Sequence, residues 1–168
     1  MIHVCSLARL HDTVSDTGAR HIVTLIKDVS LVRRPECIPE PNHLLLDMDD
    51  ISFPLDGYVL PGEQHVEKLV DFVTGWNRAA PLVVHCYAGI SRSTAGAFIA
   101  ACALNPQRDE NKIARALRDA SPTAMPNIRI VSLADTMLGR DGRMTAAIRA
   151  IGPGTAAYAS EPFRLDLE

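Results

Sequence analysis

One stretch near the middle of the chain limits what the rest can fold into: His-Cys-Tyr-Ala-Gly-Ile-Ser-Arg-Ser-Thr, residues 85–94. Residues 81–85, which run into this stretch, are mostly apolar and include two valines, a pattern that predicts a short buried strand. Residues 93–104 are rich in alanine and predict a helix. The stretch therefore predicts a turn that leads from the carboxyl end of a strand to the amino terminus of a helix.

A turn of this kind is well suited to bind a phosphate. The first N–H groups of a helix have no partner inside the helix, and a turn containing Gly89 can direct further N–H groups at the same point. The helix dipole and the charge of Arg92 favour an anionic sulfur, so we expect Cys86 to be a nucleophilic thiolate at neutral pH. Arg92 can hold two phosphoryl oxygens with its planar guanidinium, and Ser93 can donate a hydrogen bond to the sulfur.

The pattern His-Cys-x-x-Gly-x-x-Arg-Ser of residues 85–93 resembles the active-site loop of the cysteine-dependent protein tyrosine phosphatases. It is most similar to the loop of the dual-specificity and small bacterial members, and the similarity extends from about residue 20 to about residue 138. The resemblance implies a cysteinyl-phosphate intermediate on Cys86, and a supporting role for His85 in shaping the loop and tuning the thiolate. The residues that would bind the phosphoryl group through backbone N–H groups, together with Arg92, are Tyr87, Ala88, Gly89, Ile90 and Ser91.

The resemblance also implies an aspartate, from a loop well before the cysteine, that protonates the leaving oxygen. The candidates lie in or after a short apolar strand predicted within residues 42–50, and they are Asp47, Asp49, Asp50 and Asp56. The register of the strand end in dual-specificity relatives selects Asp50, with Asp49 second. A metal site at Asp47, Asp49 and Asp50 is the alternative, because hard cations bind several carboxylates. Since the thiolate and Arg92 already supply what a metal would supply, we predict no metal and no organic cofactor.

Composition and charge limit the class of protein. The chain has 168 residues, of which 47% are hydrophobic, so we predict a single domain over residues 1–168, with residues 139–168 as a C-terminal extension packed on the body. A net charge of −3 with both signs interspersed argues against nucleic acid as a partner. No apolar run approaches the roughly 20 residues that span a bilayer, and no secretory signal is evident, so we expect no membrane association. Four cysteines without a C-x-x-C pair fit the cytoplasm.

Strand and helix patterns alternate along the chain. Strands are predicted at residues 2–7, 21–26, 42–50 and 81–85, and helices at residues 62–76, 93–104, 109–120, 127–138 and 143–151. The residues after Pro162 alternate between apolar and charged, which predicts an edge strand or a docked tail. This order predicts an α/β fold with a central, mainly parallel sheet flanked by helices, and the phosphatase resemblance implies the same fold.

Together these features predict a phosphomonoester hydrolase, either a protein tyrosine or a dual-specificity phosphatase, acting on a phosphorylated protein or a small phosphomonoester. Family members that act on phosphoinositides tend to carry lysines inside the loop, and residues 87–91 contain none. Two other functions stay open. One is a binding module that recognises phosphorylated partners with little turnover. The other is a cysteine-based arsenate reductase or sulfur transferase, which requires that Cys5, Cys37 or Cys102 approach Cys86.

Overall fold

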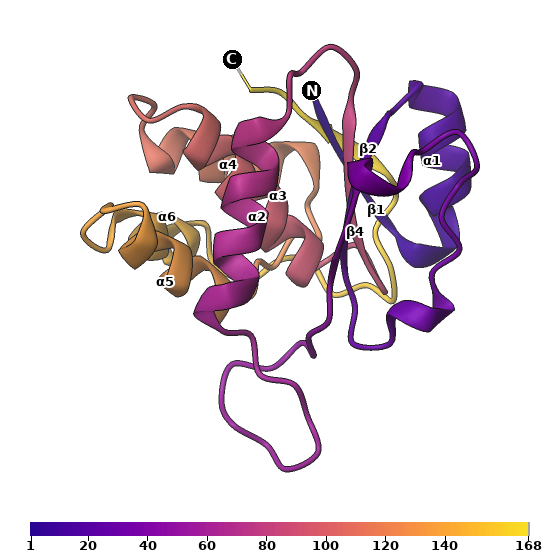
Figure 1. Ribbon diagram of the computed structural model, residues 1–168. Helices are drawn as coiled ribbons and strands as arrows, with labels where there is room; N and C mark the ends of the chain where they lie inside the picture. The colour runs from indigo at the N-terminus through magenta and orange to yellow at the C-terminus, as the bar shows by residue number, and fades with distance from the viewer. Residues whose placement is uncertain (168) are drawn as a thin grey trace.

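The computed structural model describes residues 1–167 and has an α/β layered architecture (Figure 1). Five strands form one sheet in the order β3–β2–β4–β1–β5. The strands are β1 (Ile2–Ser6), β2 (His21–Leu25), β3 (His43–Leu46), β4 (Leu82–Cys86) and β5 (Phe163–Leu165). The first four are parallel to one another, and β5 runs antiparallel to β1. The prediction of a mainly parallel sheet is therefore confirmed, with one antiparallel strand at an edge.

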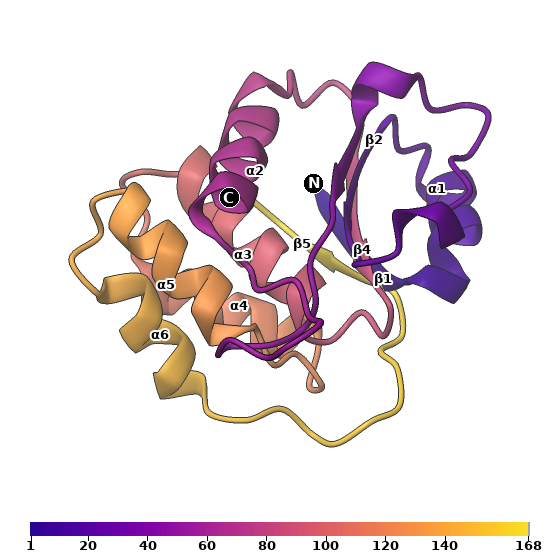
Figure 2. The ribbon, with the colours of Figure 1, turned by 60° about the horizontal axis from the view of Figure 1, so that its bottom comes forward.

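The helices cover both faces of the sheet (Figures 1 and 2). One face carries α1 (Leu10–Thr17), which ends where Gly18 adopts a left-handed conformation with φ 67°. The opposite face carries α2 (Glu63–Gly75), α3 (Arg92–Leu104), α4 (Glu110–Ala120), α5 (Ile128–Met137) and α6 (Arg143–Ile151). Three short 3-10 helices lie at Leu7–Arg9, Val29–Leu31 and Glu40–Asn42. None of the described helices has both the length and the apolar character needed to cross a membrane.

The central strand, β4, is buried along its whole length and lies between two apolar layers. Val83 packs in the cluster under α1, whereas Val84 belongs to the larger core under α3. Gly96 lets α3 approach the sheet closely, because a Cβ atom there would lie 3.1 Å from Cγ1 of Val84 and 3.3 Å from Cδ1 of Leu25. The close contact between α3 and β4 fixes both ends of the loop that joins them.

The residues after α5 pack on the rest of the body. The carboxylate of Glu110 accepts a hydrogen bond from Arg140 at 2.8 Å, and Arg140 also donates to the carbonyl of Cys102 at 2.8 Å. After α6 the chain runs past the carboxyl ends of the central strands before it adds β5 to the edge of the sheet (Figure 2). The predicted extension thus contributes a helix, a crossing segment and a strand, and its last position, 168, lies outside the described residues.

Candidate active site

The predicted turn lies between the end of β4 at Cys86 and the start of α3 at Arg92. The Cys86 side chain is almost fully enclosed, and its Sγ lies 3.1 Å from the hydroxyl oxygen of Ser93 in the first turn of α3. Gly89 has φ 74°, a left-handed conformation that favours glycine. The strand, the turn and the helix therefore bring Cys86, Arg92 and Ser93 into one site.

Four consecutive carbonyl groups of the turn accept hydrogen bonds from segments outside it, and these are termed the outer hydrogen bonds. The acceptors and their donors are Tyr87 with the N–H of Leu7 (3.1 Å), Ala88 with the N–H of Ser160 (2.8 Å), Gly89 with the hydroxyl of Ser160 (3.0 Å) and Ile90 with the N–H of Met125 (2.9 Å). In a planar trans peptide the N–H points opposite to the carbonyl. The N–H groups of residues 88–91 consequently face the inside of the turn, where no described residue accepts a hydrogen bond from them.

The guanidinium of Arg92 is buried and only partly satisfied by the protein. Its Nη1 donates to the carbonyl of Met48 at 2.8 Å, and its Cζ lies 5.8 Å from the centre of the Tyr87 ring. No described residue accepts a hydrogen bond from its buried Nε. A buried charged donor without an acceptor is costly, so this N–H is available to an anion bound in the turn.

Asp50 is the predicted acid that the fold brings to the turn. Its Oδ1 accepts hydrogen bonds from the hydroxyl of Ser91 at 2.7 Å and from the side-chain amide of Asn127 at 2.8 Å. Its Oδ2 lies 3.9 Å from Nε of Arg92. Asp50 therefore stands beside the turn and forms a long ion pair with Arg92, whose Nε has no hydrogen-bond acceptor among the described residues.

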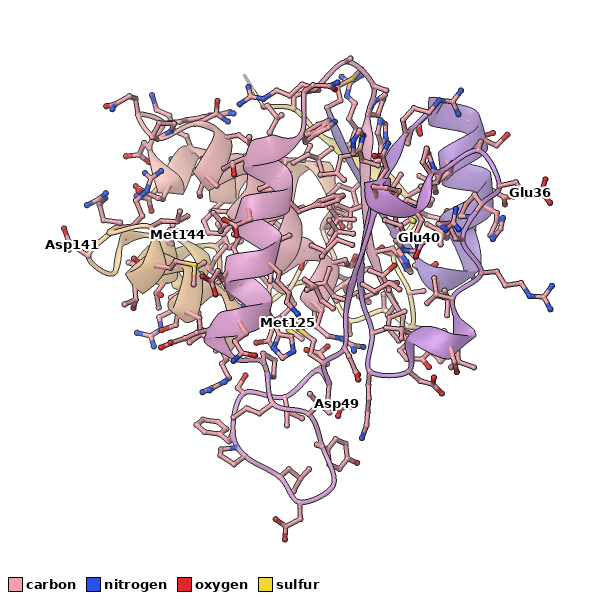
Figure 3. All side chains as sticks on the ribbon, in the orientation of Figure 1. Glu36, Glu40, Asp49, Met125, Asp141 and Met144 are labelled. Atoms are coloured by element: carbon pink, nitrogen blue, oxygen red, sulfur yellow. The ribbon has the colours of Figure 1, made fainter. Side chains whose placement is uncertain are left out.

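The other three candidate acids lie apart from the turn. Asp49, at the root of the long loop in Figure 3, accepts a hydrogen bond from the N–H of Val59 at 2.7 Å and pairs with Lys27 at 3.3 Å. Asp47 and Asp56 are exposed. Within the described residues, no hydrogen bond or ion pair joins any of these three to residues 86–93, and no group of three or more side chains is arranged to hold a metal.

His85 lies under the turn in a chain of three side chains. Its Nε2 is 2.6 Å from the hydroxyl of Thr24, and that hydroxyl is 2.8 Å from Nε2 of His43. Burial lowers the pKa of His85 to about 3 and the pKa of His43 to about 4, so both rings are neutral at neutral pH. The hydroxyl has one proton and can donate to only one ring, so the other ring must donate to it. The tautomers of the two histidines are therefore coupled through Thr24.

The remaining cysteines lack the surroundings of Cys86. Cys5 and Cys102 are buried, and burial raises the pKa of each thiol to about 12. Cys37 is exposed, and all four cysteines are free thiols. Protonated thiols are weak nucleophiles, so neither Cys5 nor Cys102 has the character of a resolving cysteine at neutral pH.

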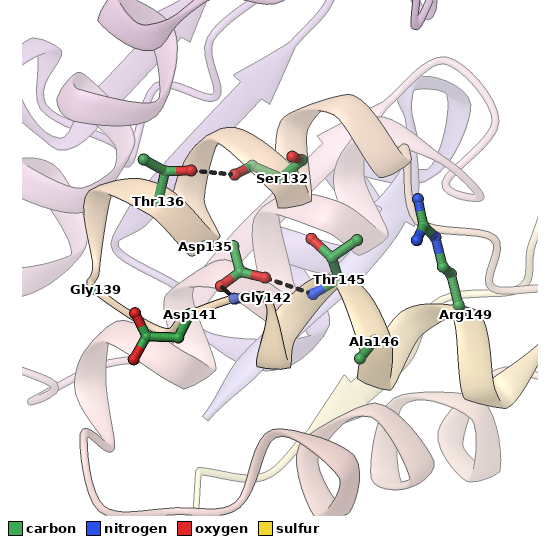
Figure 4. A pocket seen from close by; sticks show the side chains of 9 residues that line it. All are labelled: Ser132, Asp135, Thr136, Gly139, Asp141, Gly142, Thr145, Ala146 and Arg149. Atoms are coloured by element: carbon green, nitrogen blue, oxygen red, sulfur yellow. Dashed lines mark hydrogen bonds between the residues drawn. The ribbon is translucent and has the colours of Figure 1, made fainter.

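A pocket of about 440 Å³ lies between α5 and α6, and the carboxylate that lines it, that of Asp135, caps the start of α6 (Figure 4). The buried carboxylate of Asp135 accepts hydrogen bonds from the N–H groups of Gly142 at 2.9 Å and Thr145 at 2.8 Å. These donors belong to the amino terminus of α6, whose first N–H groups have no partner inside the helix. The carboxylate is thus used to begin a helix.

Sequence reasoning missed several residues that hold the site together. Asn127 is predicted only as the first residue of a helix, and its side-chain oxygen accepts hydrogen bonds from the N–H groups of Arg129 and Ile130. Its amide group also holds Asp50, across 77 positions of sequence. Thr24 and Ser160 were not predicted to belong to the site either. No local pattern marks any of these contacts.

The structure of the chain is similar to solved structures of phosphatases, whereas its sequence matches no family model. No protein-family model matches the sequence, and no curated protein matches it. Among solved structures, the phosphatase PTP-2 of Cydia pomonella is similar with a TM-score of 0.63 and 21% identity, over 80% of this chain and 84% of that chain. DUSP15 is similar with a TM-score of 0.62 and 17% identity, over 89% and 90% of the two chains. PTPMT1, in a complex with PI(5)P, is similar with a TM-score of 0.64 and 15% identity, over 89% and 94%. The chain therefore has the fold of the protein tyrosine and dual-specificity phosphatases.

Proposed function

We propose that the protein is a cysteine-dependent phosphatase that hydrolyses phosphomonoesters, and that its substrates are proteins carrying phosphotyrosine, with or without phosphoserine and phosphothreonine. The observation that carries this proposal is the set of outer hydrogen bonds, which turn the N–H groups of residues 88–91 toward the inside of the turn that begins at Cys86. The Nε of Arg92, which has no hydrogen-bond acceptor among the described residues, adds a charged donor. A tetrahedral dianion has the shape and charge that such donors bind.

Hydrolysis proceeds in two steps in this proposal. The thiolate of Cys86 attacks phosphorus, and the sulfur–phosphorus bond forms as the bond to the leaving oxygen breaks. Asp50 gives that oxygen a proton, while Arg92 and the amides of the turn bind the three equatorial oxygens. Water then attacks phosphorus, Asp50 takes a proton from it, and the sulfur leaves as a thiolate next to the hydroxyl of Ser93, 3.1 Å away. Inorganic phosphate is released.

The surroundings of the turn support an aromatic phosphate as substrate. A pocket of about 510 Å³ lies beside the turn, and its lining includes Tyr87, Leu7 and the fully exposed Tyr158. These side chains offer apolar surface to the group that carries the phosphate. A polyphosphorylated lipid headgroup is less well matched, because residues 87–91 contain no lysine. Four free thiols fit a reducing compartment, and we propose the cytoplasm.

Replacing Cys86 with serine tests the proposal. We expect the parent protein to hydrolyse p-nitrophenyl phosphate and to be inhibited by orthovanadate, and we expect Cys86→Ser to abolish turnover because an alcohol at neutral pH is a far weaker nucleophile than a thiolate. Cys37→Ser is the matched control, since Cys37 is exposed and lies outside the turn. A serine variant that hydrolyses the substrate at the parental rate would contradict the assignment of the nucleophile.

A panel of substrates tests the proposed class. Phosphotyrosine peptides, phosphoserine peptides, phosphoinositides and sugar phosphates are compared by phosphate release at equal concentration. We expect the highest kcat/KM on the phosphotyrosine peptides. A parent protein that binds vanadate but releases phosphate from none of these compounds would instead be a phosphate-binding module.

A further inference from the structure

The segment between α6 and β5, residues 152–162, turns one buried side chain toward the phosphate-binding turn. Ser160 is 5% exposed, whereas residues 155–159 before it are all exposed. Ser160 donates two hydrogen bonds, from its N–H to the carbonyl of Ala88 at 2.8 Å and from its hydroxyl to the carbonyl of Gly89 at 3.0 Å. A single residue thus supplies two of the four outer hydrogen bonds.

These two contacts determine the direction of two amide donors. With the carbonyl of Ala88 held outward, the N–H of Gly89 points inward, and the carbonyl of Gly89 fixes the N–H of Ile90 in the same way. We infer that Ser160 is a positioning residue, which keeps these two N–H groups directed at the phosphoryl oxygens during binding and hydrolysis. This inference rests on the proposed phosphatase function.

Without the two donors of Ser160, no hydrogen bond from outside the turn would fix the orientation of the peptide units that follow Ala88 and Gly89. An unpaired buried carbonyl is costly, so the carbonyls of Ala88 and Gly89 would turn toward other donors or water. A carbonyl that turned inward would meet the thiolate or the phosphoryl group with a negative dipole. The fit between the turn and Ser160 is close, because a Cβ atom at Gly89 would lie 2.3 Å from the Ser160 hydroxyl oxygen.

The segment that carries Ser160 is held on both sides. Arg118 donates hydrogen bonds to the carbonyls of Ile151, Gly152 and Pro153, where the segment begins. At the other end, Phe163 starts β5, which pairs with β1. The position of Ser160 is therefore set by the body of the protein, as a positioning role requires.

The variant Ser160→Ala tests the inference, because it removes the hydroxyl contact to Gly89 and leaves the N–H contact to Ala88. The matched control is Thr155→Ala, since Thr155 is exposed in the same segment and only its backbone forms a hydrogen bond, to Pro122. Each variant is compared with the parent for its dissociation constant for orthovanadate, for kcat and KM on p-nitrophenyl phosphate, and for thermal unfolding. The pH dependence of the alkylation of Cys86 by iodoacetate is followed by mass spectrometry, which separates Cys86 from the exposed Cys37.

We expect Ser160→Ala to weaken orthovanadate binding about fivefold to tenfold, the effect of losing one buried hydrogen bond that orients a donor. We also expect the midpoint of Cys86 alkylation to move to higher pH, because the same amides stabilise the thiolate. A residue that only stabilised the fold would change the unfolding temperature and leave both quantities unchanged in the folded protein. Thr155→Ala should match the parent in every measurement.

Two different failures are distinguishable. A parent protein that is active and binds orthovanadate, with a Ser160→Ala variant equal to Thr155→Ala in affinity and alkylation midpoint, would overturn this inference alone. A parent protein that neither hydrolyses p-nitrophenyl phosphate nor binds orthovanadate would overturn the proposed function, and the inference with it.

Discussion

The variant Asp50→Asn separates two roles that the contacts of Asp50 allow, proton donation and support of the turn. Asparagine has nearly the same shape, and its side-chain oxygen can accept the hydrogen bonds that Ser91 and Asn127 donate to Oδ1 at 2.7 and 2.8 Å. The amide cannot protonate a leaving oxygen. If Asp50 is the general acid, kcat should fall by about 10² to 10⁴.

The electrostatic effect of the same change is smaller and has the opposite direction for anion binding. At the 3.9 Å that separates Asp50 Oδ2 from Arg92 Nε, the attraction between unit charges is about 1 kcal/mol in water and about 4 kcal/mol at an effective dielectric constant of about 20. The Asp50 side chain is 37% exposed, so the lower figure applies. Removing the carboxylate also removes its repulsion of a bound anion. We therefore expect orthovanadate to bind Asp50→Asn as tightly as the parent, or up to about fivefold more tightly.

The assay compares two leaving groups. Phenyl phosphate has a poor leaving group and should show the full loss in kcat, whereas p-nitrophenyl phosphate has a good one and should show a smaller loss. The limb of the pH–rate profile that reports the protonated acid should flatten. Asp49→Asn is the control, because the asparagine oxygen can still accept from the N–H of Val59, and only the partly exposed ion pair with Lys27, worth about 1 kcal/mol, is lost.

Two results would refute this reasoning. A parallel loss of orthovanadate affinity and kcat in Asp50→Asn, equal for both leaving groups, would mean that the carboxylate acts by holding Arg92 and the turn. An unchanged pH profile in Asp50→Asn together with a loss of kcat in Asp49→Asn would assign the role of general acid to Asp49.

Two predictions concern stability. Arg140→Ala removes the buried partner of Glu110 at 2.8 Å and leaves its carboxylate with only the more exposed Arg143, at 3.2 Å. It should lower the free energy of unfolding by about 2 kcal/mol, against under about 1 kcal/mol for Arg164→Ala in an exposed pair; equal unfolding temperatures for the two variants would contradict this. Because the folded pKa values of His85 and His43 are about 3 and about 4, below the unfolded value of about 6.5, the unfolded chain binds more protons as the pH falls from about 6.5. The free energy of unfolding should therefore fall, by up to about 1.4 kcal/mol per pH unit for His85 and by less for the half-buried His43. Urea unfolding at pH 7 and pH 5 measures this, and His43→Gln should reduce the difference.

The strand, the turn and the helix around Cys86 could be predicted because their signals are local. Apolar residues end at the cysteine, a glycine follows at the position with φ 74°, and alanines begin the helix. From the residues alone the candidate acid could only be narrowed to a cluster, Asp47, Asp49, Asp50 and Asp56, and the choice of Asp50 rests on the register of the strand end in dual-specificity relatives. Which of them faces the turn depends on Ser91 and Asn127, and these contacts exist only once the chain is folded.

The missed contacts of Arg92 and of the outer hydrogen bonds share a physical cause. Arg92 is held by the carbonyl of Met48, and the turn is held through its own carbonyls, so one partner in each contact is a backbone group that every residue type carries. Such a partner leaves no trace in residue identity or periodicity. A serine at position 160 is equally unremarkable in sequence, because serine is common in loops.

A short pattern such as Cys-x-x-x-x-x-Arg therefore describes only part of a phosphate-binding turn. Four peptide units can point their N–H groups inward only if their carbonyls are satisfied from outside, and here the donors come from the residue after β1, from the residues before α5 and from the segment before β5. These donors come from sequence positions as far apart as 7 and 160, and the sheet and α3 bring them to one place. A chain that kept the pattern and lost these donors would keep its cysteine and lose the direction of its amides, so the proposed affinity of the turn for phosphate depends on the whole fold.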